Sequence, residues 1–237
     1  MKNSKSKKLV IILLGAPGSG KGTQAGLLAD KLGLYYFETS KILEKSFNLH
    51  KKQKFIKIAG KKYFYINEKK LWTKGILCSP PFTSYLVKKR IKQLYKAGEN
   101  LIIAGSPRTL YEGKNIMPVL EKLCGKKNIK VILIQVSAQE SIFRNSHRRI
   151  CELMRHPILY SKETAELKFC PLDGSKLIRR KGLDDPDTIK IRLDEYKNRT
   201  LPLIKYFRER KLNVKEINGK GSVSKVFESI LKSLKSE

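Results

Sequence analysis

Acidic residues are scarce in this sequence. Its 237 residues contain 21 aspartates and glutamates against 51 lysines and arginines, a formal net charge of +30. Such a surplus attracts polyphosphates and nucleic acid without specificity. However, the lysines are scattered over every segment, and no homeodomain, RRM or zinc-finger pattern accompanies them. We interpret the surplus as a lysine-rich solvated surface rather than a functional basic patch, and we do not expect nucleic acid as a partner.

Long apolar runs are also missing. No run approaches the roughly 20 residues of a membrane-spanning helix, so we expect no membrane partner. The lysine-rich N-terminus and the apolar run behind it imitate a secretory signal, but cleavage after Ala16 would destroy the glycine-rich segment that follows. Cysteine is rare and irregularly spaced, at Cys78, Cys124, Cys151 and Cys170. These observations favour reduced thiols and a cytoplasmic location.

The most informative stretch is LVIILLGAPGSGKGTQ, which begins at Leu9. Six apolar residues stopped by glycine predict a central parallel strand that is buried on both faces. Three glycines follow: Gly15, Gly18 and Gly20. They remove Cβ atoms where backbone N–H groups must close around phosphate oxygens, and the helix N-terminus behind them adds partial positive charge. Lys21 supplies a full charge, and Thr23 a hydroxyl for the Mg²⁺ that travels with a nucleoside triphosphate.

Further strands are predicted at 35–37, 101–104, 131–136 and 214–217, with amphipathic helices between them. This alternation predicts an α/β fold with a doubly wound, five-stranded parallel sheet. Thr39 or Ser40 is placed to cap the helix after the second strand. Pro202 should kink or interrupt a helix.

The glycine-rich string carries its hydroxyl one position later than the general phosphate-loop pattern and resembles the loop of the adenylate kinases and their nucleoside monophosphate kinase relatives. The resemblance continues at Gly105-Ser-Pro-Arg-Thr109 and in the final helices, and it spans Leu9 to Leu234. It implies a monomeric phosphotransferase with a phosphate group as acceptor. ATP would be the donor, a nucleoside monophosphate, first of all AMP, the acceptor, and Mg²⁺ the cofactor.

The resemblance also implies a division of the chain. The core would comprise 1–39, 79–147 and 185–237, the acceptor-binding subdomain 40–78, and a mobile lid of the long bacterial type 148–184. Within the acceptor-binding subdomain, residues 46–70 are very basic, interleaved with aromatics and longer than usual. This pattern fits a small subdomain core or stacking on single-stranded nucleic acid, and we favour the core.

By the resemblance, catalysis would rest on charge and alignment, because a phosphate acceptor is already an anion and needs no general base. The catalytic residues would be Lys21, Arg108, Arg148, Arg180 and Arg192. ATP would be bound by Gly15, Gly18, Ser19, Gly20, Lys21, Gly22, Thr23, Arg144, Arg148 and Gly221, with Thr23 on Mg²⁺. The acceptor would be bound by Thr39, Leu77, Gly105, Arg108, Glu112, Arg180 and Arg192.

Four residues depart from the family pattern. Glu44 stands where an arginine grips the acceptor phosphate, and Lys41 and Ala104 replace acidic residues that hold the water shell of Mg²⁺. Glu112 replaces a glutamine that reads the acceptor base, so acceptors other than AMP stay open. The departures also leave room for a nucleotide-binding pseudoenzyme or regulatory module, and the charge for a nucleic-acid-associated kinase-like protein.

The lid segment resembles a zinc-bearing lid in which one ligand is missing. Cys151, Cys170 and Asp173 fit the pattern, but Met154 offers a thioether, a poor zinc ligand, unless His156 replaces it. We therefore expect a metal-free lid packed on Cys151, Met154 and Ile158 in preference to a zinc site.

Overall fold

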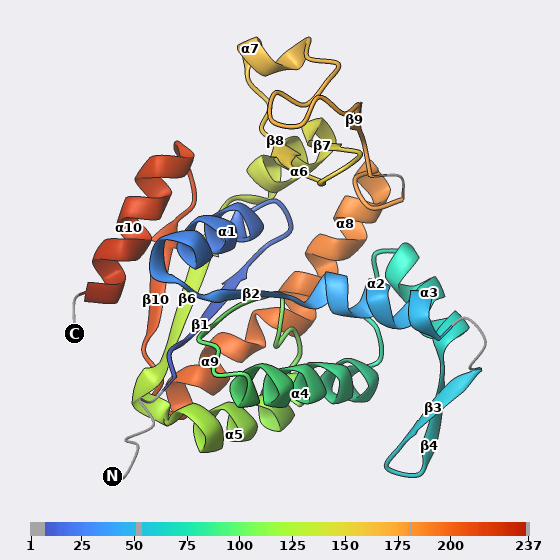
Figure 1. Cartoon of the computed structure of the whole chain (residues 1–237), viewed down its shortest axis with the longest axis vertical. Coiled ribbons are helices and arrows are strands. Elements are labelled where there is room, and N and C mark those ends of the chain that lie inside the picture. The colour runs from blue at the N-terminus through green and yellow to red at the C-terminus, as the bar shows by residue number, and fades with distance from the viewer. Residues whose placement is uncertain (1–7, 51–53, 181, 236–237) are drawn as a thin grey trace.

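The computed structural model describes residues 8–50, 54–180 and 182–235 and is built around a five-stranded sheet (Figure 1). The strand order is β10–β6–β1–β5–β2, and every neighbouring pair is parallel. The strands are β1 (Val10–Gly15), β2 (Tyr35–Glu38), β5 (Leu101–Ala104), β6 (Ile129–Gln135) and β10 (Val214–Asn218). The predicted doubly wound α/β fold is confirmed.

Helices cover both faces of the sheet. Since successive side chains of a strand point to opposite faces, Val10 and Ile12 of β1 enter one apolar cluster, and Ile11 and Leu13 enter the other. The first cluster includes α4 (Pro80–Lys96), α5 (Leu110–Cys124) and α9 (Pro202–Glu209), and the second α1 (Lys21–Leu32) and α10 (Val223–Lys235). Burial on both sides explains the unbroken apolar run.

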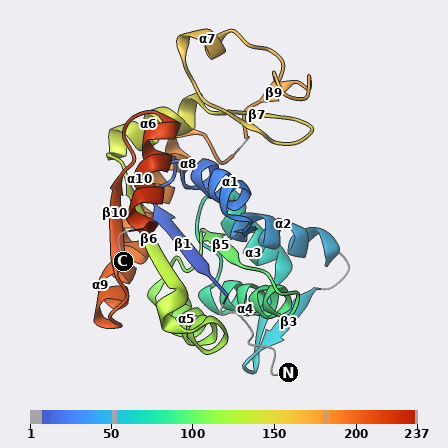
Figure 2. The ribbon, with the colours of Figure 1, turned by 60° about the vertical axis from the view of Figure 1, so that its left-hand side comes forward.

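Two smaller parts project from this core (Figures 1 and 2). One contains α2 (Thr39–Leu49), the hairpin β3 (Phe55–Ile58) and β4 (Lys61–Phe64), and α3 (Tyr65–Thr73). Apart from Thr39, its residues fall in the segment 40–78, called the acceptor segment below. The other contains β7 (Arg149–Cys151), β8 (Pro157–Ile158), α7 (Lys162–Ala165) and β9 (Leu177–Ile178), and lies within the predicted lid segment. Helices α6 (Ala138–His147) and α8 (Pro186–Glu195) precede and follow this second part in the chain.

Of the two local predictions about helix ends, the cap at Thr39 or Ser40 is wrong and the interruption at Pro202 is confirmed. Thr39 and Ser40 do not cap α2, because the helix already begins at Thr39, and Ser40 instead donates a hydrogen bond to Glu38 at 2.5 Å. Pro202 does interrupt a helix: η2 (Tyr196–Thr200) is a π-helical turn, and α9 begins at Pro202. A short 3₁₀ turn, η1 (Lys126–Asn128), precedes β6. Across the described ranges, no helix combines the length and the apolarity needed to cross a bilayer.

Candidate active site

The loop between β1 and α1 is shaped to receive an anion. Among the described residues, no side chain caps the start of α1, and its first turn carries no acidic residue. A Cβ on Gly15 would lie 2.5 Å from Ser19 Oγ and 2.6 Å from the Ile134 carbonyl oxygen, so only glycine fits there. The buried Ser19 hydroxyl has no hydrogen-bond partner within the described chain. The helix N–H groups and this hydroxyl therefore suit phosphate oxygens.

Lys21 lies at the start of α1 among other cations. Burial lowers the pKa of its amine to about 7, and the guanidinium groups of Arg108, Arg192 and Arg180 contribute to this shift. Like charges gathered in one place repel one another unless an anion joins them. The arrangement therefore concentrates positive charge beside the loop, where bound phosphates would relieve it.

Three arginines meet at one buried carboxylate. Asp184, whose side chain is 3% exposed, accepts hydrogen bonds from Arg148 at 2.5 Å and from Arg180 at 2.7 and 3.0 Å. Arg192 Nη1 lies 3.9 Å from the same carboxylate. Burial raises the pKa of Asp184, whereas Arg180 and Arg192 lower it. One carboxylate balances one of three guanidinium charges, so the cluster retains a positive surplus.

Arg108 packs against the backbone at the end of β5. A Cβ on Gly105, which has a φ of 88°, would lie 2.5 Å from Arg108 Nη2. The backbone N–H of Arg108 donates to Glu112 Oε2 at 2.8 Å, and the carbonyl of Arg108 accepts from Thr200 Oγ1 at 2.8 Å. Glu112 is 1% exposed, and burial raises its pKa to about 7. Glu112 thus fixes the turn that carries Arg108.

These groups surround a small pocket at the carboxyl ends of β1 and β5. Its volume is about 70 Å³, below the roughly 300–1,000 Å³ of typical small-molecule sites. Its lining includes Gly15, Lys21, Gly75, Leu77, Gly105, Arg108, Arg192 and Glu195. The Leu77 N–H donates to Glu195 Oε2 at 3.0 Å and so ties the acceptor segment to α8. A molecule larger than this pocket would enter it only if the parts around it separated.

A wider hollow of about 590 Å³ lies beside it, at the carboxyl ends of β6 and β10. It is lined by Gln135, Val136, Ser137, Gln139, Glu140, Phe143, Asn218 and Lys220. Arg144 borders this hollow, because it pairs with Glu140 at 2.5 Å and donates to the Gly219 carbonyl at 3.0 Å. The hollow is roomy enough for a nucleoside.

A model of the family described as adenylate kinase matches residues 13–212 of this chain. The chain belongs to the adenylate kinase family. It is 34% identical to the adenylate kinase of Mycoplasma mycoides subsp. mycoides over 230 residues, which cover 95% of this chain and 99% of that one. It is 33% identical to the adenylate kinase of Clostridium acetobutylicum over 226 residues, with 93% and 96% of the two chains covered. The corresponding protein of Caldicellulosiruptor saccharolyticus is 32% identical, with 94% and 98% covered.

Some of the remaining residues that the family pattern concerns lie near the pocket, and others lie apart from it. Thr39 is buried and donates to Ser106 at 2.9 Å, beside Gly105, and Gly22 and Thr23 lie in the first turn of α1. Glu44 lies apart from the pocket lining and pairs with Arg155 of the lid segment at 3.1 Å. The glycine-rich segment at Gly221 follows β10, beyond the Gly219 carbonyl that Arg144 contacts.

Sequence reasoning missed Glu38. In the register of β2 and β5, Glu38 lies opposite Ala104, the position at which the family pattern has an aspartate. The Glu38 carboxylate also raises the pKa of Lys21, against the effect of burial and the arginines. A polar residue at the carboxyl end of a parallel strand was the available signal. The role of Asp184 as the partner of the arginines was likewise not predicted.

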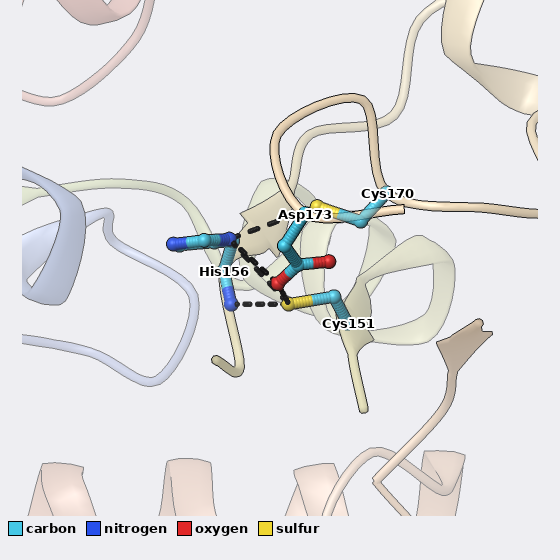
Figure 3. A group of neighbouring side chains, drawn as sticks. All are labelled: Cys151, His156, Cys170 and Asp173. Atoms are coloured by element: carbon cyan, nitrogen blue, oxygen red, sulfur yellow. Dashed lines mark hydrogen bonds and ion pairs between the residues drawn. The ribbon is translucent and has the colours of Figure 1, made fainter. Parts of the chain in front are cut away.

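The lid segment holds a second cluster of polar side chains (Figure 3). Cys151 Sγ lies 3.0 Å from Asp173 Oδ2 and 3.5 Å from His156 Nδ1, and Cys170 Sγ lies 3.6 Å from the same nitrogen. One potential ligand atom from each residue lies within 4.8 Å of all the others. The structure therefore contains a candidate four-ligand metal site.

The expected packing of a metal-free lid is wrong at Met154. This residue is 64% exposed, whereas Cys151, Ile158 and Cys170 are buried together with Leu177 against them. The chain turns at Arg155, whose φ is 60°, and the His156 carbonyl accepts the N–H of Cys151 at 3.1 Å. The turn brings His156 to the cluster and leaves Met154 outside.

Proposed function

We propose that this adenylate kinase family member transfers the γ-phosphoryl group of ATP directly to AMP, giving two ADP. A phosphate oxygen of AMP forms a bond to the γ-phosphorus, and the bond from that phosphorus to the β–γ bridging oxygen breaks. The observation that carries the proposal is the convergence of Lys21, Arg108 and Arg192 around the pocket at the carboxyl end of the sheet. Such a cluster stabilises charge on a transferring phosphoryl group without a general base.

The proposed roles follow from position. The start of α1, the Ser19 hydroxyl and Lys21 bind the β- and γ-phosphates of ATP, while the hollow beside Arg144 receives its adenosine. Arg108, next to Gly105 and Thr39, binds the acceptor phosphate. The arginines held by Asp184 turn to phosphate oxygens as the lid closes over both nucleotides.

The residues present also suit Mg²⁺. Thr23 would offer its hydroxyl to the ion, and Glu38 would accept hydrogen bonds from the water shell in place of the carboxylate missing at Ala104. When bound, the ion neutralises charge on the β- and γ-phosphate oxygens.

An assay of ADP formation with AMP, CMP, UMP and GMP as acceptors tests the proposal. We expect turnover with AMP, and at least a 100-fold loss of kcat/KM in Arg108→Lys, because lysine cannot form the bidentate contact. Lys92→Gln, on the exposed side of α4, is the matched control and should retain full activity. Tight ATP binding without turnover on any acceptor would overturn the proposal in favour of a nucleotide-binding pseudoenzyme.

We also propose that the lid cluster of Cys151, His156, Cys170 and Asp173 binds a structural Zn²⁺. Two sulfurs, one imidazole nitrogen and one carboxylate oxygen make a donor set that zinc accepts in a tetrahedron. The second oxygen of Asp173 accepts from the Ser175 N–H at 3.0 Å and from its hydroxyl at 2.8 Å, which orients the carboxylate.

Elemental analysis of the purified full chain tests the zinc proposal. We expect about one zinc per chain, retained by Met154→Leu and lost in Cys170→Ser, with a lower melting temperature after chelation. A chain without zinc, even after refolding in its presence, would overturn it.

A further inference from the structure

The hairpin β3–β4 has no role in the phosphoryl transfer proposed above. It extends from the acceptor-side part, away from the central sheet (Figure 1), and in both views it lies on the opposite side of the molecule from α10 (Figures 1 and 2). None of its residues lines either of the two pockets described above. Its sequence is basic and aromatic, with four lysines and no acidic residue from Lys54 to Phe64.

The two faces of this hairpin differ. Ile56 pairs with Tyr63 across the strands, and both pack with Ile58 against the small core that contains Phe47 and Phe82. This face is structural, in line with the small subdomain core that the sequence predicts. The residues that alternate with these belong to the other face.

On the outer face, an aromatic cross-strand pair lies next to a cross-strand pair of lysines. Phe55 lies opposite Phe64, with ring centroids 5.6 Å apart, and Lys57 lies opposite Lys62. Phe64 is 41% exposed, and both lysines are exposed. Lys62 Nζ lies 4.6 Å from the centroid of the Phe55 ring. Two aromatic surfaces thus sit next to two ammonium groups on one solvent-facing ribbon.

This arrangement is unfavourable for the hairpin alone. Like charges directly opposite each other destabilise a strand pair, and the surrounding sequence offers no acidic partner on the surface. From Lys45 to Gly98 the one acidic residue is Glu68, which is 3% exposed and accepts the Ser79 N–H at 2.8 Å. Lysines on a hairpin also discourage edge-to-edge association, but that role does not explain the aromatic pair beside them, in which Phe55 is half-buried and Phe64 exposed.

We propose that the outer face of hairpin β3–β4 binds single-stranded nucleic acid, with bases stacked on Phe55 and Phe64 and phosphates on Lys57 and Lys62. Aromatic rings accept any base, and a lysine beside each ring meets the backbone that carries the base. A duplex hides the faces of its bases, so the face discriminates in favour of single strands. The site is separate from the proposed catalytic pocket, and binding leaves that pocket open to nucleotides.

Binding of a fluorescein-labelled 12-nucleotide oligouridylate to the full chain, followed by fluorescence anisotropy over a salt series, tests this inference. We expect Lys57→Gln/Lys62→Gln to weaken binding at least fivefold at low salt, and to reduce the slope of log K against log salt by about 1.4, about 0.7 for each phosphate that a lysine no longer neutralises. The matched control, Lys225→Gln/Lys232→Gln, removes two exposed charges from α10 and should change affinity less than twofold. Equal effects in both pairs would show that net charge alone binds RNA and would overturn the inference.

The aromatic contribution is tested separately. Phe64→Leu keeps an apolar side chain but removes the ring, and we expect at least a fivefold loss of oligouridylate affinity, whereas Phe64→Trp retains binding. Unchanged melting temperature and phosphoryl transfer in these variants would show that they fold. Equal binding of double-stranded RNA, full affinity in Phe64→Leu, or hairpin-dependent binding of phosphatidylserine vesicles without RNA binding would each overturn the inference.

Discussion

Arg155 of the lid segment donates from Nη1 to both carboxylate oxygens of Glu44, at 3.1 and 3.4 Å. The two residues are separated by 111 positions and belong to the two parts that project from the core. In the family pattern an arginine stands in place of Glu44. This chain therefore has a contact between its two projecting parts where the pattern has a phosphate ligand.

We expect this pair to favour the closed arrangement. Both side chains are exposed enough for solvent to screen them, so the pair contributes about 0–1 kcal/mol. Glu44→Gln and Arg155→Gln should each raise KM for AMP by up to about fivefold, and 0.5 M salt should erase the difference from the unsubstituted chain. Steady-state kinetics of both variants and of the double variant provide the measurement. Effects that add in the double variant would contradict a direct pairing.

Lys21 should take up a proton when ATP binds. Without ligand its pKa is lowered to about 7, and bound phosphates favour the charged amine and raise it again. ATP affinity should therefore fall as pH rises above about 7, toward the pKa of the complex. Calorimetry at pH 8 in buffers of different ionisation enthalpy measures the uptake directly. An uptake of zero would show that Lys21 is already charged.

Glu112 should make stability depend on pH. Its pKa is raised by burial from 4.5 to about 7 in the folded chain, so its stabilising contribution is complete below about 4.5 and is lost as pH rises through 7. The free energy of unfolding of Glu112→Gln, relative to that of the unsubstituted chain, should therefore rise by up to about 3 kcal/mol from pH 5 to pH 8. Each pKa unit corresponds to about 1.4 kcal/mol. Urea unfolding at both pH values provides the measurement, and a constant difference between the two proteins would count against the raised pKa.

The same residue should affect the choice of acceptor. A protonated carboxyl group can donate and accept hydrogen bonds as glutamine does, whereas the ionised form only accepts. The kcat/KM for AMP should therefore decline above pH 7 in the unsubstituted chain, relative to Glu112→Gln. Parallel pH profiles of both proteins would refute this if they have the same shape.

Two glycines allow a matched pair of alanine substitutions. Gly105→Ala places a Cβ 2.5 Å from Arg108 Nη2 at a φ of 88°, so it should displace the guanidinium and lower kcat/KM for the acceptor at least tenfold. Gly26→Ala adds a Cβ to open space inside α1 and should stabilise the fold by about 0.5–1 kcal/mol at unchanged activity. Kinetics and thermal unfolding of both variants give the comparison. Normal acceptor kinetics in Gly105→Ala would remove Arg108 from its proposed role.

The proposed link between Glu38 and Mg²⁺ predicts a metal-dependent defect. Glu38→Gln should require several-fold more Mg²⁺ for half-maximal activity, because the neutral amide binds the water shell less strongly. Lys41→Gln, whose amine lies 3.6 Å from Glu38, should have the opposite or no effect. Activity measured over a range of Mg²⁺ concentrations separates the two. An unchanged Mg²⁺ requirement in Glu38→Gln would exclude Glu38 from the metal site.

What the sequence predicted well was local. The apolar run of β1 and the glycines behind it encode a buried strand and a phosphate loop in consecutive residues, and the structure has both. Glu38 escaped prediction because its neighbour Ala104 is set by the register of β2 and β5. Met154 was expected in the lid core because it stands at a ligand position of the zinc-lid pattern, but the turn at Arg155 excludes it and admits His156. The outer face of the hairpin could not be predicted, because only the strand register shows that Phe64 and Tyr63 belong to opposite faces.

The Asp184 carboxylate would compete with substrate phosphates for Arg148 and Arg180, with which it forms ion pairs. In the proposed reaction, a phosphate that takes the place of this carboxylate on Arg148 or Arg180 gains only the difference between the two sets of contacts. In the proposed reaction, the reverse exchange restores these pairs when the product leaves. On this proposal, Asp184 weakens phosphate binding and favours product release.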